Sequence, residues 1–115
     1  MAENIEAWLQ KFKKSWVSKD IDTVLELFIE DVEYFETPFQ RLEKEELRQE
    51  WRSIREQKDI GLEFEVFNSD ESRHAVIYRF ECVVDGESHR SEGVYLIELN
   101  SEGLCRSFRQ YPVEK

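Results

Sequence analysis

The sequence predicts an α+β domain with three helices in its first half and an antiparallel sheet in its second half. Apolar residues recur at helical spacing through much of residues 1–57, and they alternate with polar residues from Gly61 onward. The dipeptide Asp85-Gly86 is typical of a two-residue hairpin turn. The chain shows no linker, repeat or low-complexity tract, so we expect a single domain over residues 1–115.

The three helices are predicted from apolar residues that share one face. The first face comprises Ile5, Trp8, Leu9, Phe12 and Trp16. Asp20 is the expected N-cap of a second, short helix, whose apolar face comprises Ile21, Val24, Leu25 and Phe28. The third helix is expected over Glu43–Gln57, with an acidic first turn and a buried stripe of Leu47, Trp51 and Ile54.

The remaining segments read as strands. Asp31–Thr37 precedes the third helix as a short strand that places Val32, Tyr34 and Glu36 on one face, and Pro38 is expected to end it. After Gly61 we expect a four-stranded meander that Pro112 closes. Its parts are a strand around Leu62–Phe67, a turn at Asn68–Ser72, strands Arg73–Val84 and Glu87–Leu99, a turn at Asn100–Gly103 and a strand Leu104–Tyr111.

Charge and composition exclude several classes of function. The formal net charge is −10, from 26 acidic and 16 basic residues, which disfavours binding to nucleic acid or to anionic membranes. No apolar run approaches the roughly 20 residues of a membrane span, and residues 1–10 lack a secretory pattern, so we expect a cytoplasmic protein. Cys82 and Cys105 are expected to be free, buried thiols, and His74 and His89 lack the spacing of a metal site.

Three stretches together resemble the NTF2-like superfamily, specifically its SnoaL-like branch. They are DVEYFETPF at Asp31–Phe39, EGVYLIEL at Glu92–Leu99 and GLCRSFRQY at Gly103–Tyr111. The resemblance covers nearly the whole chain and implies a cone in which three N-terminal helices pack on a curved antiparallel sheet and leave a pocket at the open end. Members of the family include isomerases, dehydratases, polyketide cyclases and epoxide hydrolases, as well as proteins that only bind ligands or other proteins.

The candidate catalytic residues are Glu36 and Arg109. Glu36 stands where the family often has Asp; in a pocket it would act as a proton shuttle, and at a strand end it would be an exposed carboxylate. Arg109 would hold a ligand oxygen in the pocket or pair with surface acids. The chain also differs from the family at Gln110 and Tyr111, where the family has Glu and Trp.

The candidate ligand-binding residues are aromatic and have two readings, as a cavity lining or as core. Phenols that converge in one cavity would favour a ligand with a polar end. The set comprises Trp16, Tyr34, Trp51, Tyr78, Phe80, Tyr95, Phe108 and Tyr111.

Two hypotheses about function follow. The cone holds an apolar or aromatic small molecule, either as a proton-transfer enzyme of the isomerase, dehydratase or cyclase type that needs no external cofactor, or as a ligand carrier. Alternatively, the chain is a non-catalytic interaction domain that uses its sheet face. Strand Arg73–Val84 has apolar residues on both faces, including Ile77 and Val83 on the side away from Tyr78, so we expect a homodimer through the outer sheet face.

Overall fold

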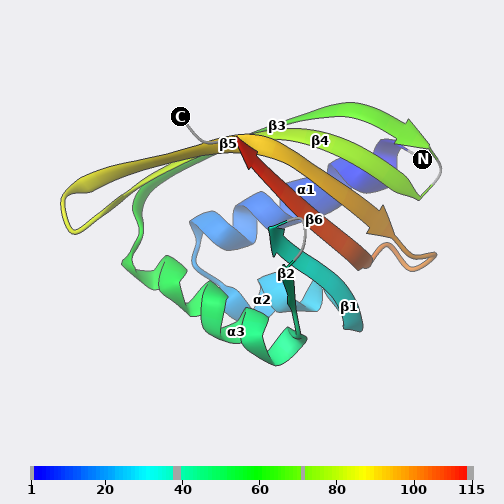
Figure 1. Ribbon diagram of the computed structural model, residues 1–115, viewed down its shortest axis with the longest axis horizontal. Helices are drawn as coiled ribbons and strands as arrows, with labels where there is room; N and C mark the ends of the chain where they lie inside the picture. The colour runs from blue at the N-terminus through cyan, green and yellow to red at the C-terminus, as the bar shows by residue number, and fades with distance from the viewer. Residues whose placement is uncertain (1, 38–39, 71, 114–115) are drawn as a thin grey trace.

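A computed structural model describes residues 2–37, 40–70 and 72–113 and shows helices packed under an arched sheet (Figure 1). In these ranges the helices are α1 (Ala2–Val17), α2 (Ile21–Glu26), α3 (Lys44–Arg52) and a 3-10 helix (Ser53–Glu56). The strands are β1 (Phe28–Thr37), β2 (Gln40–Leu42), β3 (Lys58–Asp70), β4 (Arg73–Val84), β5 (Glu87–Leu99) and β6 (Cys105–Val113). The α+β cone expected from the sequence is therefore confirmed.

The sheet has the order β2-β1-β6-β5-β4-β3 in the described part of the chain, so the predicted meander is present. The β4–β5 turn falls at Asp85-Gly86, whose φ angles of 51° and 81° are those of a primed hairpin turn. The sheet is mostly antiparallel, as predicted, but β1, which lies outside the predicted meander, pairs with β6 in parallel. Such a pairing needs a long connection, which α3 and the meander supply.

The second helix is shorter than predicted, and Phe28 begins β1 instead of completing a helical face. The carbonyl of Leu27 accepts hydrogen bonds from Trp8 Nε1 at 3.1 Å and from the Cys105 backbone N–H at 2.8 Å. These bonds tie the end of the helix to α1 and to the start of β6. Asp20 is the N-cap as expected, and its carboxylate accepts from the Thr23 backbone N–H at 3.2 Å.

The sheet also differs from the prediction at several strand ends. The return strand β2 has no counterpart in the prediction, and β3 continues through Asp70, within the predicted turn. Pro112 lies inside β6 opposite Gly93. Within the described residues the pairing of β6 with β1 extends only to Arg109, so no ladder bond seen on that side requires a backbone N–H at Pro112. Pro38 lies outside the described residues.

The core lies between α1 and the concave face of the sheet, and Phe12 is at its centre. Phe12 is 1% exposed, and its ring contacts seven others: Trp8, Trp16, Phe28, Trp51, Phe64, Tyr95 and Phe108. The predicted stripe of Leu47, Trp51 and Ile54 is buried beside this cluster. Cys82 and Cys105 are free and buried, as expected. No helix in the described ranges has the length and apolar character needed to cross a bilayer.

Candidate functional site

A cavity of about 220 Å³ opens between the concave face of the sheet and the helices. Six of the candidate ligand-binding residues line it, from α1, α3 and β1, β4 and β5: Trp16, Tyr34, Trp51, Tyr78, Phe80 and Tyr95. It is larger than the roughly 150 Å³ apolar cavity that binds benzene in an engineered protein, and smaller than the roughly 300 Å³ lower end of pockets for drug-sized ligands. A compact ring compound matches this volume.

One wall of the cavity is built from aromatic rings that hold one another in place. Trp16 stacks on Phe80 with ring centroids 4.7 Å apart, and it meets Trp51 edge to face at the same separation. The indole N–H of Trp16 donates to Gln57 Oε1 at 2.9 Å. Because that polar group is occupied, the Trp16 ring is positioned to offer its apolar surface to a ligand.

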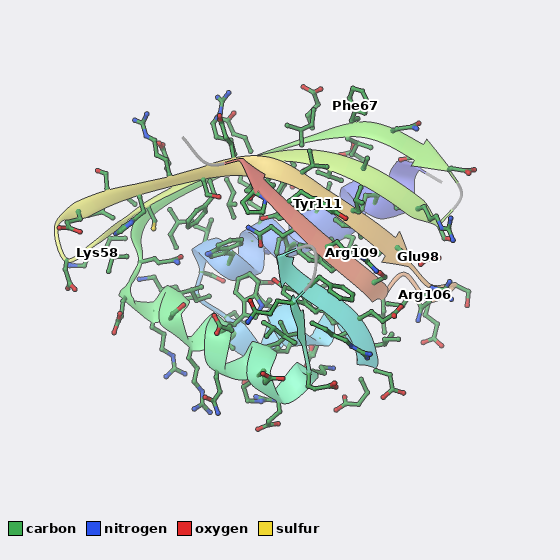
Figure 2. The ribbon with its side chains drawn as sticks, in the orientation of Figure 1. Lys58, Phe67, Glu98, Arg106, Arg109 and Tyr111 are labelled. Carbon is green, nitrogen blue, oxygen red and sulfur yellow. The ribbon has the colours of Figure 1, made fainter. Side chains whose placement is uncertain are left out.

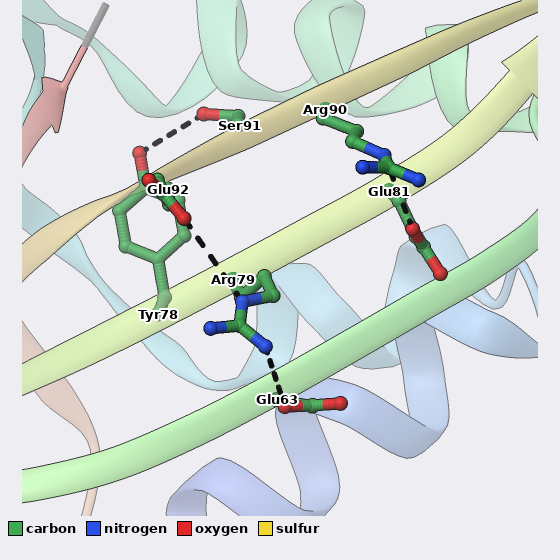
Figure 3. Close-up of polar contacts among 7 residues, drawn as sticks. All are labelled: Glu63, Tyr78, Arg79, Glu81, Arg90, Ser91 and Glu92. Atoms are coloured by element: carbon green, nitrogen blue, oxygen red, sulfur yellow. Dashed lines mark hydrogen bonds and ion pairs between the residues drawn. The ribbon is translucent and has the colours of Figure 1, made fainter.

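The sheet side of the cavity also carries a polar cluster, which we call the Tyr78 cluster. It comprises Tyr78, Ser91 and Gln110, one residue from each of β4, β5 and β6, and Ser91 is the cross-strand partner of Phe80. Ser91 Oγ lies 3.2 Å from Tyr78 Oη (Figure 3). Gln110 Nε2 donates to the same phenol oxygen at 3.0 Å. Tyr78 is paired with Gly93, which has no side chain, and its phenol reaches across β5 to Gln110 on β6. The three side chains therefore form one hydrogen-bonded group on the cavity wall.

Tyr95 lies beside this cluster and is only 2% exposed. Burial, and next the nearby phenols of Tyr34 and Tyr78, raise the pKa of Tyr95 well above its ordinary value. Its hydroxyl therefore stays protonated and neutral at physiological pH. The side chains of Tyr34, Tyr78 and Tyr95 all line this cavity.

Three candidate residues lie elsewhere. Phe108 is 1% exposed and stacks on Tyr34 with centroids 4.9 Å apart, so it is core behind the cavity. Arg109 follows Phe108 on the strand and points to the opposite face, where its guanidinium carbon lies 4.1 Å from the centroid of the Phe35 ring. Tyr111 shares that outer face and is 37% exposed. The alternation of β6 thus corrects the expected positions of Arg109 and Tyr111. The side chain of Glu36 lies outside the described part of the structure.

The outer face carries adjacent apolar side chains from β4, β5 and β6, which we call the outer apolar row: Ile77, Val94, Leu96 and Tyr111. Ile77, Val94 and Tyr111 are opposed in register, and Leu96 lies in the next register row. Phe67 projects from the same side of the sheet at a bulge in β3 and is 72% exposed (Figure 2). Charged side chains border the row, including Arg79, which lies 3.6 Å from Glu63 and 4.0 Å from Glu92 (Figure 3).

The cavity lining also includes residues that were not predicted as site residues from the sequence. Ser91 and Gln110 could have been found by alternation, because they share strand faces with Tyr95 and Phe108 respectively. Glu50 on α3 brings an exposed carboxylate to the lining. Its position beside the cavity depends on tertiary packing, and no local pattern predicts it. Within the described ranges, no cluster of three or more His, Cys, Asp or Glu residues is arranged to hold a metal ion.

No protein-family model and no curated protein sequence matches the chain, whereas solved structures match over nearly its whole length. Δ5-3-ketosteroid isomerase from Mycobacterium sp. has a TM-score of 0.80 and 21% identity, covering 94% of this chain and 92% of that one. The epoxide hydrolase/cyclase-like enzyme SalBIII has a TM-score of 0.81 and 18% identity, covering 97% and 92%. An NTF2-like protein from Exiguobacterium sp. 255-15 has a TM-score of 0.75 and 16% identity, covering 97% and 99%.

Proposed function

We propose that this chain, which has the NTF2-like fold of the SnoaL-like type, is a small-molecule-binding protein whose cone holds a compact ring compound. The observation that supports the proposal is the cavity of about 220 Å³, whose lining combines aromatic rings with the Tyr78 cluster. Binding sites for small molecules characteristically combine apolar walls with a few fixed polar groups. The rings supply apolar contact, and the polar cluster orients the ligand.

Nuclear magnetic resonance tests this proposal directly, because two indoles line the cavity. Titration of small ring compounds should shift the indole N–H resonances of Trp16 and Trp51 and leave that of Trp8 unaffected. Trp8 is the internal control because its indole N–H is buried and hydrogen-bonded to Leu27. If a diverse set of single-ring compounds at millimolar concentration shifts neither cavity indole, the proposed function is wrong.

A catalytic form of this proposal is proton transfer, which the ketosteroid isomerase and SalBIII among the fold neighbours suggest. A base would take a proton from carbon next to a carbonyl, and a Tyr hydroxyl would stabilise the enolate oxygen. Glu36 is the base expected from the sequence, and Glu50 is a carboxylate on the cavity lining. The test measures how fast the methyl protons of acetophenone exchange with deuterium in heavy water. If the protein is a catalyst, it speeds this exchange. The variant that lacks the catalytic base, either Glu36→Gln or Glu50→Gln, should then lose the acceleration.

A second candidate function is self-association, which the outer apolar row supports. Two residues of the row, Ile77 and Leu96, are 40% and 41% exposed. An exposed row of adjacent apolar side chains typically marks a contact surface. The occupant we propose is a second copy of this chain. Glu65 lies on one side of the row and Arg109 on the other, so a two-fold arrangement would set acidic margins against basic ones.

Light scattering after size-exclusion chromatography tests the homodimer. The wild-type protein should have twice the chain mass at micromolar concentration, and Ile77→Asp or Leu96→Asp should reduce it to the mass of one chain. Val17→Asp is a matched control, because Val17 is 45% exposed on α1, away from the outer sheet face. A monomeric wild-type protein would contradict the proposal.

A further inference from the structure

Gln110 determines which groups of the Tyr78 cluster donate hydrogen bonds and which accept them. A phenol oxygen has one proton to donate and two lone pairs that accept. Gln110 Nε2 donates to Tyr78 Oη at 3.0 Å and so occupies one lone pair. An amide nitrogen of Gln cannot accept a hydrogen bond, and the proton of Tyr78 is therefore directed elsewhere.

Counting protons over Tyr78 and Ser91 shows what the cluster offers. Their oxygens lie 3.2 Å apart, and either one can be the donor. The pair has two O–H protons, and the bond between them uses one. Whichever hydroxyl donates in that bond, the other keeps its proton, and both side chains line the cavity. The cluster therefore offers a hydrogen-bond donor for a ligand.

The charges around the cavity restrict the acceptor further. Among the residues that the structure describes, no Arg or Lys lines the cavity. The cavity lining does include one charged side chain, that of Glu50. A carboxylate or phosphate placed among these rings would lose its hydration without gaining a counterion, which is strongly unfavourable. A neutral carbonyl oxygen needs only the donor that the cluster offers.

We propose that the cone selects an uncharged ring compound with a carbonyl oxygen that accepts from the Tyr78–Ser91 pair, and that Gln110 is the positioning residue that sets this preference. This inference rests on the proposed function. The isosteric change Gln110→Glu tests it, because an ionised carboxylate accepts the proton of Tyr78. The phenol oxygen then keeps a lone pair facing the cavity, and the cluster prefers a ligand that donates.

The experiment measures dissociation constants by titrating the Trp16 indole resonance with four probes at about pH 8, where carboxylic acids are normally ionised. Acetophenone carries the carbonyl, α-methylstyrene has the same shape without an acceptor, benzoate carries the charge, and aniline is a donor. The wild-type protein should bind acetophenone about fivefold more tightly than α-methylstyrene, the worth of one hydrogen bond, and benzoate least well.

Tyr78→Phe combined with Ser91→Ala removes both hydroxyls of the pair and should reduce the preference for acetophenone over α-methylstyrene, whereas Gln110→Glu alone should remove this preference and strengthen the binding of aniline. Arg109→Gln is the matched control, because Arg109 precedes Gln110 on the other sheet face. Equal wild-type binding of the two shape-matched probes, tighter binding of benzoate, or an unchanged preference in a folded Gln110→Glu protein would overturn the inference and leave the proposed function intact. Should Gln110→Glu not fold, the comparison with the combined Tyr78→Phe and Ser91→Ala variant decides. Failure of every probe to bind would instead reject the proposed function.

Discussion

The phenol rings of Tyr78 and Tyr95 stack with their centroids 4.1 Å apart and their planes 7° apart. The two residues are on neighbouring strands, and Tyr78 extends its hydroxyl to Ser91 and Gln110 while Tyr95 remains 2% exposed. The stack thus joins the polar wall of the cavity to the aromatic core. It also places a phenol where ionisation is unfavourable, which couples the stability of the fold to alkaline pH.

The free energy of unfolding should fall as pH rises above about 10, the ordinary pKa of tyrosine. Because burial raises the pKa of Tyr95 in the folded state, the unfolded chain releases this proton first. The unfolded state then binds fewer protons than the folded state, so each further pH unit costs up to about 1.4 kcal/mol. Urea unfolding of the wild-type protein and Tyr95→Phe across this range measures the effect, and the variant should lose stability less steeply.

Cys105 adds a second contribution in the same direction. Burial raises the pKa of its thiol above the ordinary value of 9.0, so its share of the stability is lost as pH rises from about 9. Cys105→Ala in the Tyr95→Phe background should flatten the profile further. Identical slopes in the wild-type protein and both variants would contradict the assignment.

Phe12→Ala should cost about 3–5 kcal/mol of unfolding free energy, the range for removing a large buried aromatic ring. The ring contacts seven other aromatic rings and is 1% exposed, so its loss leaves a cavity that several elements must share. Phe12→Leu is the matched control and should cost clearly less, because it retains part of the buried volume. A loss below about 1 kcal/mol for Phe12→Ala would show that the core collapses around the gap.

Gly93→Ala should destabilise the protein by about 1–3 kcal/mol or more, as overpacking does. A Cβ at Gly93 would overlap the backbone oxygen of Tyr111 and lie 2.9 Å from Pro112 Cα, and these backbone atoms cannot move aside without distorting β6. Gly61→Ala is the control, because the nearest atoms there belong to the flexible side chain of Glu81. Thermal unfolding followed by circular dichroism compares the two, and an equal effect would contradict the backbone explanation.

The sequence predicted elements well where local spacing and burial coincide. The limits Arg73–Val84 and Glu87–Leu99 match β4 and β5 residue for residue, because both strands alternate and Asp85-Gly86 fixes their register. The sequence predicted element boundaries less well where a residue far away in the chain determines where a helix or strand ends. Phe28 has helical spacing, yet contacts between Leu27 and both Trp8 and Cys105 end the helix before it. No local pattern contains those partners.

The candidate site shows the same division. The aromatic candidates were selected because their spacing places them on inward faces, as cavity lining or as core, and six of the eight line the cavity. Arg109, a residue of the GLCRSFRQY motif, was a candidate either for the pocket or for surface pairing, and its neighbour Phe108 occupies the inward position of β6. Applying the alternation of the strand to that motif would have selected Gln110 instead. The contact between Glu50 and the cavity depends on how α3 packs, which the sequence pattern does not specify.

Glu98→Gln should make the protein less stable by about 1 kcal/mol at neutral pH, the usual scale for a partly screened ion pair. Glu98 Oε1 accepts from Arg106 at 2.7 Å and lies 3.6 Å from Arg73, and its side chain is 19% exposed (Figure 2). The hydrogen bond from Arg106 is the main cause that lowers the pKa of Glu98 in the folded state. The stabilisation is therefore present above the ordinary pKa of glutamate, 4.5, and is lost as pH falls through the lower folded value. Urea unfolding from neutral to acidic pH should show that the stability of the wild-type protein and that of Glu98→Gln become equal at low pH.

The control is Glu81→Gln, which should change the free energy of unfolding far less. Glu81 pairs with Arg90 at 3.6 Å, and both side chains are more than half exposed. A difference between the wild-type protein and Glu98→Gln that persists unchanged at low pH would show that the loss comes from packing and not from charge.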